Sequence, residues 1–143
     1  MKEYQSLAHT KWDCKYHVVF IPKRRKKKIF GVLRRHLGEV FRELAKHKEA
    51  EVVEDHLMPD HVHMCLSIPP KYAVSNVVGY MKGKSAITIA RRFGGRERNF
   101  TGEVFWARGY FVSTVGLDEE MVRTYIRNQE ELDARHDQMK LGV

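Results

Sequence analysis

The segment Leu57–Pro69, LMPDHVHMCLSIP, carries the pattern that decides the fold of this chain. After the Pro-Asp pair, apolar residues take every second position as far as Ile68, with histidine, cysteine and serine between them. Because successive side chains of a strand point to opposite faces, this alternation predicts a strand with one face toward a core. His61 and His63 share the other face, where two adjacent imidazoles could ligate a metal ion. The alternative is a pair of surface histidines on an exposed strand.

The elements on either side of this strand follow in a regular order. β-Branched and aromatic residues predict further strands, and apolar residues spaced three and four apart predict helices. The expected elements are strands at 15–23, 51–57 and 61–68, one or two short strands within 103–114, and helices at 32–48, 73–93 and 117–138. This β-α-β-β-α-β-α order predicts an α+β, ferredoxin-like antiparallel sheet with an added C-terminal helix, in a single domain of residues 1–143.

Composition and charge limit the function classes. Lysine and arginine number 26 against 18 acidic residues, which gives a net charge of +8 and an isoelectric point near 9.6. No apolar run approaches the roughly 20 residues that span a bilayer, and the N-terminus has no apolar signal region. Cys14 and Cys65 form no motif, so we expect a cytoplasmic protein with reduced thiols and no membrane partner.

Much of the positive charge is clustered. Residues 23–28 are all basic, and a second cluster runs from Lys82 to Arg98. Clustered cations suit a polyanion, because each phosphate contact releases condensed counterions. The clusters therefore predict contacts with nucleic acid; the alternative is the solvated surface of a basic protein.

The segment Gly79–Ser85, GYMKGKS, resembles a phosphate-binding loop but does not fit one. Three residues separate its glycines where that loop requires four, and the segment lies inside a predicted helix. We therefore reject a nucleotide site. The two glycines are instead expected to form a small strip, flanked by Lys82 and Lys84, where a backbone or a phosphate comes close.

The apolar stripe of the last predicted helix contains a residue that is out of place. The stripe is formed by Val122, Tyr125, Ile126, Gln129 and Leu132. An amide buried without partners costs about 1–3 kcal/mol, so Gln129 needs a polar neighbour unless the stripe drifts to the helix edge and leaves it wet. Tyr125 lies one turn before Gln129 on the same face. If this face packs on the histidine strand, two imidazoles, an amide oxygen and a phenol meet around one point.

Such a set of groups suits the cleavage of a phosphodiester. A metal ion polarises the phosphate and offsets its developing charge. The phenol of Tyr125 attacks phosphorus, displaces a sugar oxygen and becomes a phosphotyrosine, so the energy of the ester is kept without nucleotide hydrolysis. Free tyrosine has a pKa near 10, so the phenol must be activated by the metal or by a base.

Four motifs occur in the order found in the HUH single-tyrosine transposases of small insertion sequences, which this chain resembles over nearly its whole length. They are MPDHVHMCL (58–66), MKGKSA (81–86), WARGYFVSTVG (106–116) and VRTYIRNQE (122–130). The resemblance implies that His61 and His63 are metal ligands, that Gln129 is the third ligand, and that Tyr125 forms a 5′-phosphotyrosine. It implies Mg²⁺ as the cofactor, with Mn²⁺ as a substitute. Related transposases of repetitive palindromes share this core.

The resemblance also implies partners. The family acts on single-stranded DNA that carries subterminal hairpins, at the nucleoid of bacterial or archaeal cells. It works as a homodimer in which the tyrosine helix can serve the histidines of the partner subunit, and Gly116 would be the hinge that lets this helix move. The DNA contacts expected from the two basic clusters are Lys23, Arg24, Arg25, Lys26, Lys27, Lys28, Lys82, Lys84, Arg91 and Arg92.

The sequence therefore predicts an enzyme, a DNA transposase that cuts and rejoins single strands at the ends of an insertion sequence. One alternative is a replication-initiator-type nicking endonuclease, which shares the histidine pair and the tyrosine. The other is a non-enzymatic, ferredoxin-like module that binds nucleic acid and uses its basic residues only for affinity.

Overall fold

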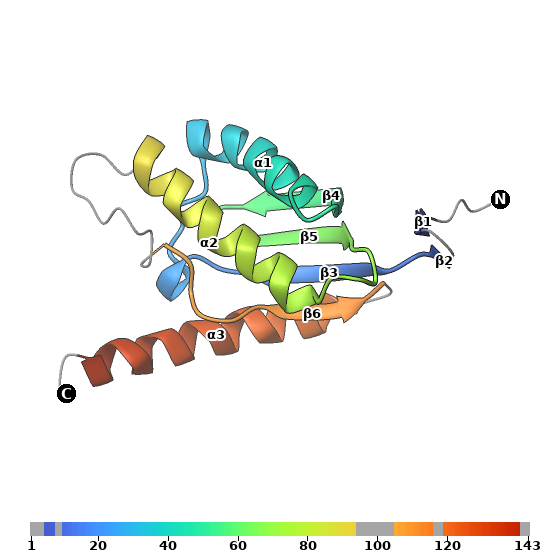
Figure 1. The fold of residues 1–143 in the computed structure, drawn as a ribbon. Coiled ribbons are helices and arrows are strands. Elements are labelled where there is room, and N and C mark those ends of the chain that lie inside the picture. The colour runs from blue at the N-terminus through green and yellow to red at the C-terminus, as the bar shows by residue number, and fades with distance from the viewer. Residues whose placement is uncertain (1–4, 8–9, 94–104, 116–118, 141–143) are drawn as a thin grey trace.

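An antiparallel sheet of four strands forms the centre of the molecule (Figure 1). The structure is a computed structural model that describes residues 5–7, 10–93, 105–115 and 119–140. The strands of the sheet are β3 (Lys15–Phe20), β4 (Glu51–Met58), β5 (His61–Ser67) and β6 (Phe111–Thr114), in the order β4-β5-β3-β6. Every neighbouring pair is antiparallel. The ferredoxin-like α+β fold is therefore confirmed.

Three long helices cover the sheet. They are α1 (Gly31–Lys46), α2 (Val74–Phe93) and α3 (Glu119–Lys140). Helices α1 and α2 pack on one face, and α3 runs along the other (Figure 1). The segment Gly79–Ser85 lies within α2, so the rejection of a phosphate-binding loop holds.

The two faces of strand β3 belong to different hydrophobic cores. Val18 and Phe20 join the large core under α1 and α2, whereas Val19 and Ile21 pack with Ile126 of α3. All of these strand residues are at most 1% exposed. A central strand that is covered on both sides reads as a continuous apolar run, which is why the segment Val18–Ile21 shows no alternation.

Strand β5 has the alternation that the sequence predicts. Val62, Met64 and Leu66 are at most 1% exposed and lie in the core under α1 and α2. His61 and His63, which alternate with these residues, are half-buried and project to the opposite face of the sheet. The pattern in Leu57–Pro69 thus sets both the core and the histidine face.

Several elements differ from the expectation. Strands β1 (Gln5–Leu7) and β2 (Thr10–Trp12) pair with each other in a small separate sheet that the sequence analysis did not predict. The basic run begins with a short 3₁₀ turn, η1 (Lys23–Arg25). In the last strand region only Phe111–Thr114 forms a regular strand, and Trp106 makes an isolated bridge to Pro22.

The buried stripe of helix α3 also needs a correction. Ile126 is buried as expected, but Leu132 is 53% exposed and its neighbour Asp133 is only 4% exposed. The buried Asp133 carboxylate accepts a 2.7 Å hydrogen bond from the backbone N–H of Arg24. This charge-assisted bond replaces a contact with water that the carboxylate loses on burial. A donor from a distant turn therefore changed which residue the helix buries.

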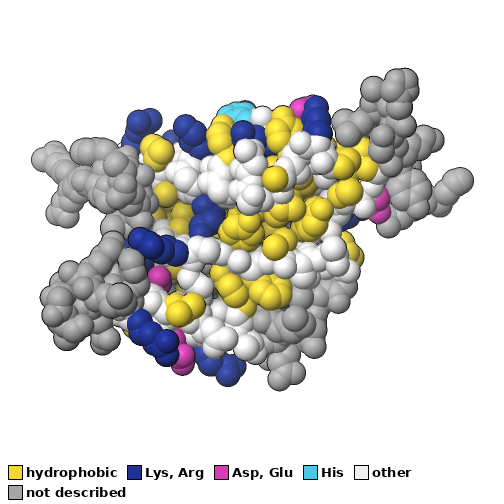
Figure 2. Space-filling model, turned by 60° about the horizontal axis from the view of Figure 1, so that its bottom comes forward, with side chains coloured by type: hydrophobic (Ala, Val, Ile, Leu, Met, Phe, Trp, Pro, Cys, Tyr) yellow, Lys and Arg dark blue, Asp and Glu magenta, His cyan; other side chains and the backbone are white. Residues whose placement is uncertain are grey.

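The surface on the side of α3 is mixed in character. Hydrophobic side chains gather across its middle, and lysines and arginines lie toward its edges (Figure 2). Among the described residues, no helix is both long enough and apolar enough to cross a membrane.

Candidate active site

His61 and His63 lie on the face of the sheet that receives helix α3. Val19 is the direct partner of His63 across the β3–β5 ladder, and directly paired residues point to the same face. Val19 in turn packs with Ile126 of α3. The strand pattern and the helix therefore meet on one side, as the sequence analysis required.

Each histidine of the pair has a polar partner. His61 Nδ1 lies 2.8 Å from Oδ1 of Asp60, and His63 Nε2 lies 3.1 Å from Nδ1 of His17. The ring of His56 lies 5.8 Å from that of His63. Burial, reinforced by the neighbouring imidazoles, lowers the pKa of His63, which favours the neutral form that binds metals.

His17 and His56 were not among the site residues predicted from the sequence. Both lie beside His63 because β3 and β4 flank β5 in the sheet, and His56 is its direct cross-strand partner. His17 lies on the same strand face as Val19, two residues away. Strand alternation could have put each residue on a face, but only the strand order identified the neighbours.

The histidine pair could supply two ligands to a divalent cation. Asp60 holds Nδ1 of His61, which leaves Nε2 to coordinate, the usual arrangement of a metal-binding histidine. Within the described residues, no group of three or more His, Cys, Asp and Glu side chains could hold a metal. A third protein ligand would therefore have to be of another type, such as the amide oxygen expected from Gln129.

Tyr125 lies over strand β6. Its ring centroid is 5.4 Å from that of Phe111, and its hydroxyl is the nearest atom to the Cβ position of Gly109, at 3.9 Å. The hydroxyl is buried and has no hydrogen-bond partner among the residues that the structure describes. Burial, together with the charge of Asp133 and the phenol of Tyr110, raises the pKa of Tyr125. In this position burial keeps the phenol in its protonated form, so it is not activated as a nucleophile.

The register gives the separation between the phenol and the histidines. His63, Val19 and Phe111 lie opposite one another in a single row across β5, β3 and β6. Neighbouring strands are about 4.8 Å apart, so the backbone of Phe111, against whose ring Tyr125 packs, lies roughly 10 Å from that of His63. Helix α3 thus shares the histidine face, but the structure does not bring Tyr125 beside the histidines of its own chain.

Gln129 is satisfied by the backbone in this position. Its Nε2 donates to the carbonyl oxygen of Arg108, in the segment that precedes β6. The side chain is half-buried, so neither fully wet nor fully enclosed. This bond uses only the amide nitrogen, and the amide oxygen is the atom that would ligate a metal. Gly116, the expected hinge, lies outside the described residues.

The cations expected to bind DNA fall into two groups. Lys26, Lys27, Lys28, Lys84, Arg91 and Arg92 are exposed, and so is Arg24, whose backbone N–H is held by α3. Lys23 and Arg25 are half-buried, and Arg25 forms ion pairs with Asp60 and Glu130. Lys82 donates to the carbonyl oxygens of Ala107 and Gly109, and burial lowers its pKa to about 8.

The glycine strip of α2 is open. A Cβ atom at Gly79 or Gly83 would meet nothing within 4 Å in the described ranges, so none of the described backbone fills the strip. Ser85, the last residue of the same motif, is fully buried and accepts a 3.0 Å hydrogen bond from the indole N–H of Trp106. That part of the motif serves packing.

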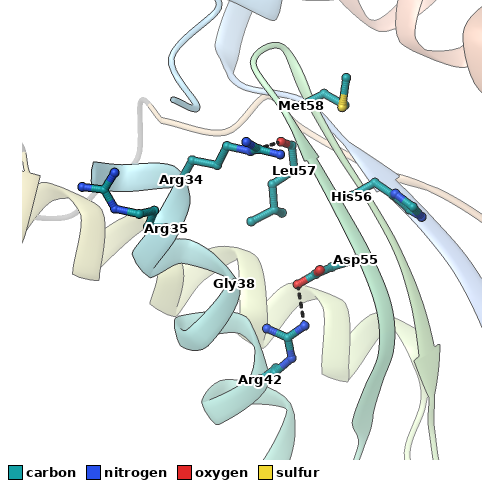
Figure 3. Close-up of a pocket in the computed structure, with 8 residues that line it drawn as sticks. All are labelled: Arg34, Arg35, Gly38, Arg42, Asp55, His56, Leu57 and Met58. Carbon is teal, nitrogen blue, oxygen red and sulfur yellow. Dashed lines mark hydrogen bonds and ion pairs between the residues drawn. The ribbon is translucent and has the colours of Figure 1, made fainter. Parts of the chain in front are cut away.

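A basic pocket that the sequence analysis missed lies between α1 and the edge strand β4 (Figure 3). It encloses about 330 Å³ and is lined by Arg34, Arg35, Arg42, Asp55 and four other residues. Arg34 Nε donates to Leu57 O at 2.8 Å, and Arg42 pairs with Asp55 at 3.2 Å. Gly38, with Arg34 and Arg42 four residues away on each side, was the available signal.

Gly38 explains why the pocket can form. A Cβ atom there would lie 3.3 Å from Nη1 of Arg42 and 3.4 Å from Oδ2 of Asp55, so a larger residue would require this ion pair to shift by a few tenths of an ångström. His56 also lines the pocket, but its ring points away from the arginines (Figure 3). The pocket and the histidine cluster therefore lie on the two sides of strand β4.

The fold and the histidine face define a small α+β protein in which a central sheet presents two neighbouring histidines on the side of helix α3. The family model described as "Transposase IS200 like" matches residues 10–129. The chain is 41% identical over 141 residues to the transposase for insertion sequence element IS200 of Salmonella typhimurium, covering 99% of this chain and 93% of that protein. It is 29% identical to the ISDra2 transposase TnpA of Deinococcus radiodurans, over 88% of this chain and 86% of that protein.

Solved structures agree with this result. A candidate transposase from Deinococcus radiodurans superposes with a TM-score of 0.78 and 26% identity, covering 90% of this chain and 98% of that chain. A REP-associated tyrosine transposase bound to a REP hairpin has a TM-score of 0.55 at 12% identity, covering 88% and 68% respectively, and shares the fold. The chain belongs to the IS200-like transposase family, and it is a transposase.

Proposed function

We propose that this transposase cleaves and rejoins single-stranded DNA at insertion-sequence ends by metal-assisted transesterification through Tyr125. The observation that carries the proposal is the pair of half-buried histidines, His61 and His63, on the sheet face that also receives α3. That helix bears both the phenol and the amide of Gln129.

In the proposed reaction, Tyr125 Oη forms a bond to phosphorus while the bond to the 3′ oxygen breaks. The products are a 5′-phosphotyrosine and a free 3′ hydroxyl; the phenol loses its proton to solvent and the leaving oxygen takes one up. A 3′ hydroxyl from another DNA end then reverses the step and joins the strands. His61, His63 and Gln129 would hold Mg²⁺ or Mn²⁺, which offsets the charge on the phosphate when bound.

The docked position of Tyr125 implies that the reacting phenol comes from elsewhere or moves. Phe111, on which the Tyr125 ring packs, lies about two strand spacings, roughly 10 Å, from His63 of its own chain, and burial disfavours the ionised form of the phenol. We therefore propose a homodimer in which α3 of one subunit serves the histidines of the other. Close to a bound cation, the ionised phenolate would be stabilised by the opposite charge, which its present buried site does not provide.

DNA with hairpins is the proposed substrate. One structural relative is bound to a REP hairpin. The exposed residues Lys26, Lys27 and Lys28 and the arginine pocket along β4 offer cationic surface for its phosphates. The pocket lies on the other side of β4 from His56, so a strand held there could continue around the edge of the sheet toward the histidines.

A covalent-adduct assay tests the proposal. A labelled single strand with an element-end hairpin is incubated with the protein and Mg²⁺ or Mn²⁺, and adducts are resolved in SDS. We expect an adduct that maps to Tyr125, disappears with a chelator, and is lost in Tyr125→Phe and His61→Ala but kept in Tyr80→Phe. No adduct despite hairpin binding would favour a non-enzymatic binding module.

Two further outcomes refine the result. Joining of the two element ends into a circle is expected of a transposase, whereas nicking and resealing of one site alone would favour an initiator-type nicking enzyme. Mixing Tyr125→Phe and His61→Ala protomers should restore activity if the phenol acts on the partner's site. A mixture as inactive as its parts would place both functions in one chain.

A further inference from the structure

Arg25 joins three segments around the candidate active site. Its Nε donates to Asp60 Oδ2 at 3.0 Å, and its Nη1 donates to Glu130 Oε2 at 3.0 Å. The other carboxylate oxygen of Asp60 lies 2.8 Å from Nδ1 of His61. One guanidinium therefore connects the carboxylate that holds His61 to the residue that follows Gln129 on helix α3.

The turn that carries Arg25 has an unusual backbone. Arg24 and Arg25 have φ angles of 59° and 53°, in the left-handed region that is unfavourable for a residue with a side chain. The N–H of Arg24 is held by the buried carboxylate of Asp133 at 2.7 Å. Such a conformation persists where surrounding contacts determine it, so helix α3 helps to select the turn that directs Arg25 at Asp60.

Both oxygens of the Asp60 carboxylate are engaged in this arrangement. Oδ1 lies 2.8 Å from Nδ1 of His61, and Oδ2 accepts a 3.0 Å hydrogen bond from Nε of Arg25. The side chain is 20% exposed, so the carboxylate is largely withdrawn from water and depends on these two partners. Losing Arg25 would leave it with a single partner.

We infer that Arg25 is a positioning residue that fixes Asp60 against His61 and ties this pair to helix α3 through Glu130. The inference rests on the proposed function, because it gives His61 the task of a metal ligand. A carboxylate on the second ring nitrogen sets the tautomer and orientation of a ligating histidine. Arginine suits the link because its planar group donates in two fixed directions, which an ammonium group cannot do.

The link has a consequence for the movement of α3. Any displacement of the helix must separate Glu130 from Arg25 and Asp133 from the backbone of Arg24. The orientation of His61 and the docking of the tyrosine helix are therefore coupled. Arg25 therefore has a different role from its neighbours Lys26 and Lys27, which are exposed and accessible to DNA.

Three variants of the full-length protein test the inference. Arg25→Gln removes the guanidinium that makes both arms of the link, and Glu130→Gln removes only the charge of the helix arm. Lys27→Gln is the matched control, because it removes the same charge from an exposed neighbour. The readouts are the His61 tautomer by nitrogen NMR without metal, hydrogen exchange along the described part of α3, and Mn²⁺ affinity by electron paramagnetic resonance.

We expect Arg25→Gln to mix the His61 tautomers, speed exchange in α3 and weaken Mn²⁺ binding about tenfold, the lower end of the range for groups behind metal ligands. Glu130→Gln should speed exchange in α3 and weaken Mn²⁺ by a smaller factor. If Arg25→Gln matches Lys27→Gln in tautomer and exchange, the inference is overturned, whatever the wild-type protein does with DNA. A wild-type protein without Mn²⁺ binding or adduct would instead refute the proposed function, and the first two readouts would still decide the positioning role.

Discussion

Replacing Tyr125 with phenylalanine should stabilise the protein while abolishing its chemistry. The hydroxyl of Tyr125 is buried and, within the described part of the chain, has no hydrogen-bond partner. A buried hydroxyl left without a partner costs about 1–3 kcal/mol, because it gives up its bonds to water and gains none. Tyr125→Phe removes only that hydroxyl and keeps the ring against Phe111. We therefore expect the free energy of unfolding to rise by about 1–2 kcal/mol.

The measurement is urea unfolding at pH 7, supported by thermal unfolding at equal protomer concentrations. For a chain of this size, each kcal/mol corresponds to about 2–4 °C in Tm. At pH 7 the phenol is neutral in the folded and unfolded states, since burial raises its pKa from the ordinary value of 10, so ionisation does not contribute. The comparison thus isolates the hydroxyl.

Tyr80→Phe is the matched control. The Tyr80 hydroxyl lies 2.7 Å from Nδ1 of His47, so its removal should lower the unfolding free energy by about 0.5–1.5 kcal/mol. The two substitutions delete the same atom and are expected to shift stability in opposite directions. A Tyr125→Phe protein that is no more stable than the wild type would show that the phenol has a partner or water, and the argument from its burial would fail.

Three further predictions follow from the same contacts. Lys82→Met should remove a pH dependence of stability, because burial lowers the pKa of Lys82 from 10.5 to about 8. Between these two pH values the unfolded chain binds more protons than the folded protein, so wild-type stability rises with pH relative to the variant by about 1.4 kcal/mol per pH unit. A constant difference in urea unfolding between the two proteins from pH 7.5 to 9.5 would contradict this. Ile126→Ala should lower the unfolding free energy by about 2–4 kcal/mol in the same assay because the Ile126 side chain is only 5% exposed, whereas Leu132→Ala, at a residue 53% exposed, should change it by less than about 0.5 kcal/mol. Equal effects of the two substitutions would show that Leu132 is buried as the sequence predicted. Replacing residues 26–28 with alanine should reduce the salt dependence of single-strand binding by about 0.7 in slope for each lost phosphate contact, and an unchanged slope would locate DNA elsewhere.

Local periodicity was enough to predict the sheet, the long helices and the face that the histidines share. Alternation in the segment Leu57–Pro69 and the spacing of apolar residues in α1 and α2 follow directly from the geometry of strands and helices, so a single stretch of sequence contains them. The same holds for the placement of Tyr125 and Gln129 on one side of the last helix. These features depend only on residues that are neighbours along the chain.

Tertiary contacts decided the rest, because strand order and side-chain pairing join residues far apart in sequence. The order β4-β5-β3-β6 puts two strand spacings between Phe111 and His63, and so keeps the docked phenol from its own histidines. The hydrogen bond from the N–H of Arg24 allows α3 to bury Asp133, whereas Leu132 stays exposed. Formal charge likewise did not reveal that Arg25 is committed to Asp60 and Glu130, since an ion pair is defined by distance in space.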